Sequence, residues 1–278
     1  MSKTVWGFGN RRIDFSVGPL FMGVLNITPD SFSDGGEYVR KEQAIGHALK
    51  MIEQGADIID IGGESSRPGS KPVSEQTELE RVVPVIEALR KQSDVLISID
   101  TCKSSVARAA LEAGVDIVND ISAATFDKAM GEVVAEFDCP IIIMHMKGTP
   151  KTMQRAPSYK NVVKEITGFF RGRIDALKQF GIHKIILDPG IGFGKRTEDN
   201  LNILNELRKF KDLGFPLLIG LSRKSFIGDV LNRDVSQRKD ASVGANVVAY
   251  LNGANILRIH DVAETRDAVL IAKAIKNI

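Results

Sequence analysis

Short apolar runs and helical patterns alternate along almost the whole chain. The runs read as continuous rather than alternating hydrophobic segments, which is typical of strands buried on both faces of a parallel sheet. Eight strands are predicted from these runs, at Leu20–Leu25, Asp57–Ile61, Val95–Ile99, Asp116–Val118, Pro140–Met144, Lys184–Leu187, Leu217–Leu221 and Asn255–Ile259.

The segments between the runs carry apolar residues at helical spacing. In Lys41–Gln54 and Glu75–Lys91 they follow the i, i+3, i+4, i+7 pattern of a helix with one buried face. The other predicted helices are Lys103–Ala113, Phe126–Phe137, Tyr159–Phe180, Asn200–Leu213, Ser242–Leu251 and Val262–Ile275. Several predicted helices end at a glycine, which adopts the left-handed cap without a steric penalty: Gly55, Gly114, Gly181, Gly214 and Gly253.

The order helix, glycine, turn, strand and polar residue recurs eight times at roughly 33-residue intervals, which is the size of a barrel repeat. We predict a (β/α)8 TIM barrel, with an open doubly wound sheet as the alternative, because strand order alone does not prove closure. Thr4–Phe8 and Arg12–Phe15, around Gly9 and Asn10, predict a β-hairpin that covers the N-terminal mouth of the barrel. Residues 1–278 then form one domain, with the hairpin in 1–16 and the barrel in 17–278.

Composition narrows the function classes. The chain has 37 basic and 35 acidic residues and only 6% aromatic residues, which disfavours nucleic acid as a partner. No apolar run approaches the ~18 residues of a membrane span, and the first residues, MSKTVWGFGNRR, lack a hydrophobic signal core. Cys102 and Cys139 form no CxxC pair, so a reducing cytoplasm is expected.

Every predicted strand ends in polar or ionisable residues. One such residue can be explained as a helix N-cap, but eight of them converge on the C-terminal mouth, where barrel enzymes place their chemistry. They are Asn26, Gly62–Arg67, Asp100–Thr101, Asn119–Asp120, His145, Asp188–Gly190, Ser222–Lys224 and Arg258–His260.

The loop NITPDSFSDGG, from Asn26 to Gly36, is too long and too polar for a simple turn. It resembles the first signature of the dihydropteroate synthases. IDIGGESSRPGS, SIDTCKSSVA, IVNDISA, LDPGIGFGK, GLSRKSFIG and RIHDV resemble the later signatures of that family, in the family's order. The resemblance spans Leu20 to Val262. In the second motif this chain has Ser66 where the family usually has Thr, which keeps the hydroxyl and removes a methyl group.

The resemblance implies displacement of diphosphate from 6-hydroxymethyl-7,8-dihydropterin diphosphate by the amine of p-aminobenzoate. Carboxylates should face the donor-rich pterin edge, and cations should face the diphosphate. Asp100, Asp188 and Lys224 are the expected catalytic residues, and the expected pterin site is Asp100, Asn119, Met144, Asp188, Phe193 and Lys224. The expected diphosphate site is Asn26, Ser65, Ser66, Arg67, Arg258 and His260. The expected p-aminobenzoate site is Phe32, Ser66, Pro68, Phe193, Lys224 and Ser225.

Further properties follow from the same resemblance. Mg²⁺ is the expected cofactor, with Asn26 as its protein ligand. A homodimer through the last helices and inhibition by sulfonamides are also expected. The loops Thr28–Glu37 and Ser65–Pro72 have few apolar anchors, so we predict that they order over bound substrate and exclude water.

Two other functions remain open at this point. A pterin-binding methyltransferase domain would use methyltetrahydrofolate and expel no diphosphate, and a silent pterin-binding barrel would act as an assembly partner. GIGFGK, Gly190–Lys195, lacks the spacing of a nucleotide loop. His47, His145, His183 and His260 show no zinc-site spacing.

Overall fold

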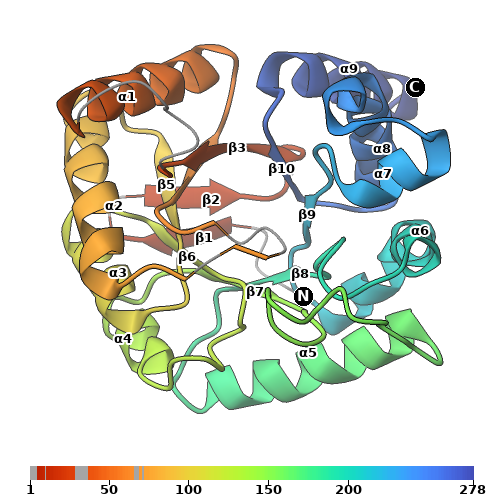
Figure 1. The fold of residues 1–278 in the computed structure, drawn as a ribbon, viewed down its shortest axis with the longest axis horizontal. Helices are drawn as coiled ribbons and strands as arrows, with labels where there is room; N and C mark the ends of the chain where they lie inside the picture. Colours follow the sequence, from red (N-terminus) through yellow and green to blue (C-terminus); the bar gives the residue numbers. More distant parts are fainter. Residues whose placement is uncertain (1–4, 10, 29–36, 66–68, 71) are drawn as a thin grey trace.

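The computed structural model describes residues 5–9, 11–28, 37–65, 69–70 and 72–278. A ring of helices surrounds eight parallel strands (Figure 1). The strands are β3 (Leu20–Asn26), β4 (Ile58–Gly62), β5 (Leu96–Asp100), β6 (Ile117–Asp120), β7 (Ile141–Met144), β8 (Ile185–Asp188), β9 (Leu218–Gly220) and β10 (Ile256–Ile259).

The sheet closes on itself. Strand β10 pairs with both β3 and β9, so the last strand lies beside the first. A single parallel bridge between Leu187 and Leu217 joins β8 to β9 and completes the ring. The barrel prediction is therefore confirmed, and the open sheet is excluded.

The helices match the predicted order with shifted ends. They are α1 (Glu37–Glu53), α2 (Glu75–Arg90), α3 (Ser104–Glu112), α4 (Met130–Glu136), α5 (Val162–Lys178), α6 (Thr197–Asn205), α7 (Ser225–Leu231), α8 (Lys239–Leu251) and α9 (Val262–Lys276), with short 3-10 helices η2 (Leu207–Leu213) and η3 (Val235–Gln237). The prediction was wrong about Asn200–Leu213, which is divided between α6 and η2, and it missed α7. Helix α7 is too short to show helical periodicity in the sequence.

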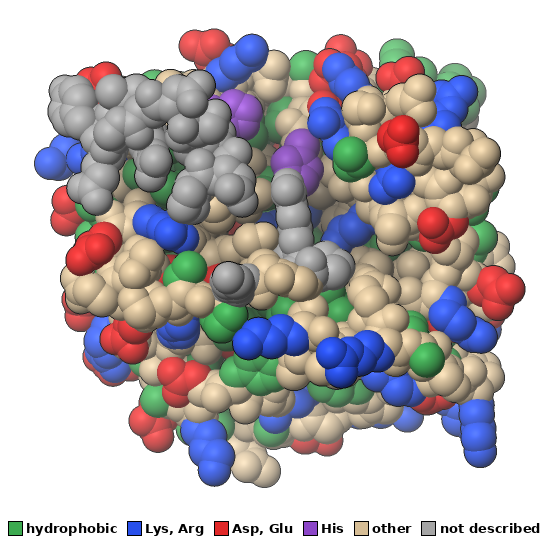
Figure 2. Space-filling model, viewed as in Figure 1, with side chains coloured by type: hydrophobic (Ala, Val, Ile, Leu, Met, Phe, Trp, Pro, Cys, Tyr) green, Lys and Arg blue, Asp and Glu red, His purple; other side chains and the backbone are tan. Residues whose placement is uncertain are grey.

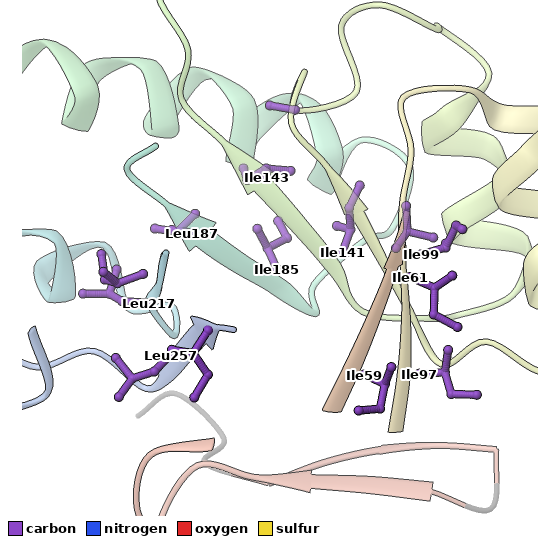
Figure 3. Close-up of a cluster of buried hydrophobic side chains, with 14 of the residues drawn as sticks. Ile59, Ile61, Ile97, Ile99, Ile141, Ile143, Ile185, Leu187, Leu217 and Leu257 are labelled. Carbon is purple, nitrogen blue, oxygen red and sulfur yellow. The ribbon is translucent and has the colours of Figure 1, made fainter. Parts of the chain in front are cut away.

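Alternate strand residues point outward and pack under the helices. Figure 3 shows pairs of them two residues apart on neighbouring strands, such as Ile59 with Ile61 and Ile97 with Ile99. These four side chains are fully buried. Because both faces of each strand are covered, the strands need apolar residues at successive positions, which explains the continuous runs in the sequence.

The inward-pointing residues at the N-terminal ends of the strands pack against the hairpin. Strands β1 (Val5–Phe8) and β2 (Arg11–Asp14) pair antiparallel. Their apolar side chains form one cluster with residues from the strands of the barrel, and the cluster comprises Trp6, Phe8, Ile13, Phe15, Leu20, Met22, Ile58, Ile117, Ile142, Ile186, Leu218 and Ile256, with Leu96 packed against it. The hairpin therefore covers the N-terminal end of the barrel, as predicted.

Candidate active site

The inward side chains become polar toward the C-terminal ends of the strands. Inward-pointing residues that follow the apolar cluster by two or four positions along the strands line one pocket. Residues from the loops after β8 and β9 also line it. The predicted residues that it brings together are Asp100, Asn119, Met144, Asp188, Phe193, Lys224, Arg258 and His260. Val24, Ile121, Gly190, Ile191, Gly220 and Ser222 complete the lining.

Arg258 is held by two carboxylates. Its Nε donates to Asp60 Oδ2 at 2.6 Å, and its Nη2 donates to Asp100 Oδ2 at 2.8 Å. Asp60 Oδ2 also accepts from Asn119 Nδ2 at 3.1 Å. Asp60 is fully buried in the barrel interior, and it holds both the Arg258 guanidinium and the Asn119 amide in place.

Asp188 ends β8 and is only 8% exposed. Its Oδ1 accepts from the backbone N–H of Gly190 at 2.7 Å, and burial raises the pKa of its carboxyl, against the lowering effect of that hydrogen bond and of the Lys224 ammonium. Gly190 has φ +70°, and a Cβ atom there would lie 2.1 Å from the carbonyl oxygen of His145. Only glycine therefore allows the loop to turn this tightly behind Asp188.

Lys224 stands at the N-cap of α7, with its Nζ 4.2 Å from the centre of the Phe193 ring. Burial lowers the pKa of Lys224 to about 8, and the Arg258 cation acts in the same direction, while Asp188 and Asp100 oppose the shift. Burial also raises the pKa of Asp100 to about 7, although the neighbouring Arg258 opposes this. The site thus holds an acid and a base that both titrate near neutral pH.

A second pocket of about 620 Å³ adjoins this one and shares Asp100 and Ile121 with it. Lys103 lines the second pocket, and its Nζ pairs with Glu64 Oε2 at 2.6 Å and with the buried Glu78. This triad supports the carboxyl ends of β4 and β5 from the side of α2 and α3.

Comparison with known proteins identifies the family. A family profile described as pterin binding enzyme matches residues 22–260. The dihydropteroate synthase of Synechocystis is 46% identical over 96% of this chain and 93% of that protein, and that of Escherichia coli K12 is 46% identical over 92% and 91%. A crystal structure of Yersinia pestis dihydropteroate synthase with a sulfonamide drug superposes with a TM-score of 0.93 at 43% identity, covering 99% of this chain and all of that one. The chain belongs to the dihydropteroate synthase family.

Four of the predicted site residues lie outside the described residues: Phe32, Ser66, Arg67 and Pro68. The same is true of residues 29–36 and 71, which belong to the two loops that were predicted to order over substrate. Their roles, and the prediction that the loops order over substrate, therefore stay predictions. The rest of the predicted set is described. Asn26 ends β3, partly buried, and Ser65 accepts a hydrogen bond at its carbonyl from Ser70 Oγ at 2.5 Å. Ser225 is exposed at the start of α7.

His145, although it follows a strand, does not line the pocket. It is 7% exposed, and burial together with the nearby Lys195 cation lowers its pKa to about 3, so the ring is neutral. Asp60 and Lys195, which are buried partners of site residues, were not predicted from the sequence. An aspartate inside the apolar run IIDIG was the available signal for Asp60.

A resident metal cluster does not form among the described residues, because no three His, Cys, Asp or Glu side chains are arranged to bind one. Asn26 offers a single amide oxygen at the mouth. Such a hard oxygen ligand fits an Mg²⁺ ion that arrives with a phosphate group and keeps its waters, but it does not form a cage by itself.

None of the helices in the described part of the chain combines the length and the apolar character needed to span a bilayer. Acidic and basic side chains are interspersed over the face of the molecule in Figure 2.

Proposed function

We propose that this protein condenses 6-hydroxymethyl-7,8-dihydropterin diphosphate with p-aminobenzoate to form 7,8-dihydropteroate and diphosphate. The observation that carries the proposal is the pocket in which Asp100, Asn119 and Asp188 face Lys224 and Arg258. The family relationship supports the same reaction. A neighbouring structure from Xanthomonas albilineans, with a TM-score of 0.88 and 41% identity, is described as a complex with 7,8-dihydropteroate.

The pterin ring binds through complementary donors and acceptors. Asp188 and Asp100 supply carboxylate acceptors for its N–H groups. Asn119 donates its amide N–H to Asp60, which leaves its oxygen as an acceptor for the ligand. Lys224 donates to the ring oxygen or nitrogen, and a site paired in this way rejects analogues that lack these groups.

Bond breaking runs ahead of bond formation in the proposed mechanism. Departure of diphosphate leaves a cation on the methylene, delocalised into the electron-rich dihydropterin. Asp100 and Asp188, fixed and largely buried, stabilise that positive charge where it develops. The aminobenzoate amine then attacks the methylene carbon, the C–N bond forms, and the proton of the amine passes to the released diphosphate.

The leaving diphosphate needs the opposite charge. Arg258 and His260 at the end of β10, with Arg67, Ser65 and Ser66 after β4 and Asn26 after β3, suit its oxygens. Asn26 would hold an Mg²⁺ ion that arrives with the diphosphate, and such an ion would supply neutralisation of charge on the leaving group.

The p-aminobenzoate ring packs beside Phe193, whose ring stacks with the Lys224 ammonium. Phe32, Pro68, Ser66 and Ser225 complete the proposed pocket. The Yersinia pestis structure, which is described as a complex with a sulfonamide drug, supports the proposal that sulfonamides inhibit this protein.

The deciding experiment mixes the purified protein with the pterin diphosphate, p-aminobenzoate and Mg²⁺. Formation of dihydropteroate with equimolar diphosphate supports the proposal. Methyl transfer from methyltetrahydrofolate, without diphosphate release, would instead support the methyltransferase alternative. Binding of a pterin with neither reaction would support a silent barrel.

We further propose a homodimer that works in the cytoplasm. Exposed apolar side chains on α8 and α9, including Val248, Ile271 and Ile275, offer a surface for a second copy. Both cysteines are free thiols, which suits a reducing compartment. Sedimentation of the native protein and of Ile271→Glu tests the dimer, which the charged variant should dissociate.

A further inference from the structure

Lys195 ends the GIGFGK segment, which matches no nucleotide-binding loop. Its side chain is only 4% exposed and does not line the pterin pocket. Its Nζ lies 3.0 Å from His145 Nδ1, 3.1 Å from the His145 carbonyl oxygen and 3.1 Å from the Phe193 carbonyl oxygen. These three acceptors match the three hydrogens of an ammonium group. A neutral His145 presents Nδ1 as an acceptor only with its proton on Nε2, so the contact also selects the tautomer.

The lysine joins two segments that carry the site. His145 directly follows β7 and donates its backbone N–H to the Asp188 carbonyl at 2.9 Å. Phe193 belongs to the loop that begins at Asp188. Lys195 therefore bonds both sides of the narrow gap between the end of β7 and the loop after β8.

The loop is pressed closely against its neighbour across this gap. A Cβ atom at Gly190 would lie 2.1 Å from the His145 carbonyl oxygen, and one at Gly194 would lie 2.3 Å from the Lys147 carbonyl oxygen. The glycines thus permit the approach, and the Lys195 ammonium supplies a donor to carbonyls that the approach would otherwise bury without a partner.

Three neutral side chains hold the outer part of the same loop, one of which is Gln154, whose Nε2 donates to the Gly192 carbonyl at 3.0 Å. Tyr159 donates its hydroxyl to the Gly194 carbonyl at 2.8 Å, and Asn200 accepts from the Gly192 N–H at 2.8 Å. Lys195 differs from them in its depth and, when protonated, in its charge: burial lowers its pKa to about 7, and the Asp188 carboxylate opposes that shift. Its positive charge also favours the ionised form of Asp188, which burial disfavours.

We propose that Lys195 is a positioning residue for the condensation: its buried ammonium fixes the Asp188–Phe193 loop against His145, and so places the Asp188 carboxylate and the Phe193 ring for the two substrates. This inference rests on the proposed function and assigns the GIGFGK lysine a role within it. Lys195 is not among the residues that line the pocket, so in this proposal it acts without touching a substrate. Its effect is transmitted through the backbone of the loop.

The test replaces Lys195 by methionine, which keeps the unbranched stem and removes the donors. Lys184→Met is the matched control, because Lys184 directly precedes β8, at the end of that strand opposite the pocket. Its Nζ donates to the Asp138 carbonyl at 2.9 Å and to the Asp138 carboxylate at 2.7 Å. Misplacement of reacting groups by about 1 Å costs on the order of 100-fold in rate. We therefore expect kcat/KM of the Lys195→Met variant to fall by about 100-fold, with weaker binding of a plain pterin measured by calorimetry, whereas Lys184→Met stays within a factor of about 3 of wild type.

Both variants are assayed well below their measured unfolding midpoints. If Lys195→Met is folded and retains kcat/KM and pterin affinity within a factor of about 3 of wild type, the positioning role is wrong while the proposed function stands. The same holds if its loss equals that of the control. If wild type itself forms no dihydropteroate, the proposed function fails instead. Should the methionine variant not fold, Lys195→Gln is measured in its place: it keeps two N–H donors on a shorter stem and loses the charge, so a fall in kcat/KM of about 10-fold or more supports the role of the ammonium, and unchanged kcat/KM and pterin affinity exclude it.

Discussion

Arg258 and Asp60 form a buried ion pair inside the barrel, with Nε 2.6 Å from Oδ2. The aspartate has no exposed surface, whereas the arginine side chain is 22% exposed toward the mouth. Arg258 was predicted to bind the leaving diphosphate, yet two of its nitrogen atoms donate to Asp60 and Asp100 in the structure. These contacts fix the guanidinium before any substrate arrives, so its cationic plane is preorganised at the floor of the pocket.

Replacing Asp60 by Asn should therefore affect stability and activity together. The variant removes the negative charge that pairs with Arg258 and replaces one carboxylate oxygen by an NH2 group, leaving a single neutral amide oxygen to accept from Arg258 and Asn119. Breaking a buried ion pair costs about 3–5 kcal/mol, and we expect urea unfolding to show a loss of that size. Steady-state kinetics should show a higher KM for the pterin diphosphate.

Asp138→Asn is the control for that experiment, because Asp138 pairs with Lys184 while 83% exposed. An exposed pair contributes about 0–1 kcal/mol. Equal stability losses in the two variants would contradict the assignment of Asp60 as the anchor of Arg258.

Asp188→Asn should reduce turnover far more than it reduces stability. Asparagine has nearly the same volume, but it lacks the negative charge that would stabilise the cationic pterin. We expect kcat/KM to fall by a few hundred-fold, equivalent to roughly 3 kcal/mol or more of transition-state stabilisation. Near-normal kinetics in stopped or continuous assays of dihydropteroate formation would remove Asp188 from the reaction centre.

The barrel was predictable because burial on both sides forces each strand into an apolar run that stands out in the sequence. The pocket was predictable because the polar residue after each run lies at a shared mouth, which brings Asp100, Asn119, Asp188 and Lys224 together. The substrates were predicted from the family resemblance and not from any pattern of residues in the sequence.

Other features could not be found from the sequence in the same way. Asp60 lies inside a strand rather than at its end, so only the closed barrel reveals that it faces Arg258 across the interior. Helix α6 begins at Thr197, three residues before the predicted start, because the N-cap Arg196 bonds Asp199, a pairing outside the usual N-cap residues. In the sequence, Lys195 is only the last residue of a glycine-rich segment that lacks the spacing of a nucleotide loop. Its contact with His145 is seen only in the folded structure.

The hairpin should matter for stability and not for catalysis. Ile13 is 1% exposed in the cluster at the barrel bottom, so Ile13→Ala should lower the free energy of unfolding by about 2–5 kcal/mol. Because the cluster lies at the opposite end from the pocket, both KM values should be unchanged at temperatures where the variant is folded.

Val17→Ala, at a side chain that is 62% exposed, is the control and should change stability by less than about 0.5 kcal/mol. Chemical denaturation followed by circular dichroism measures both variants. A small change in the free energy of unfolding of Ile13→Ala would mean that the packing of the hairpin contributes little to stability.

The pH dependence of kcat/KM should be bell-shaped, with its maximum between about pH 7 and 8. Asp100 has its pKa raised to about 7 by burial, so below that value it is protonated and loses its function as a pure acceptor and as a stabilising charge. Lys224 has its pKa lowered to about 8 by burial, so above that value it loses the ammonium that we propose donates to the pterin. Since kcat/KM reports the ionisation of the free enzyme, these two values set the acid and alkaline limbs.

Lys224→Arg separates the two limbs. A guanidinium remains charged throughout the accessible pH range, so the alkaline limb near pH 8 should disappear while the acid limb near pH 7 stays, on a lower absolute rate caused by the larger side chain. Asp100→Asn should have the reciprocal effect on the acid limb. An alkaline limb that is unchanged in Lys224→Arg would assign that ionisation to another group, such as Lys195, whose pKa burial lowers to about 7.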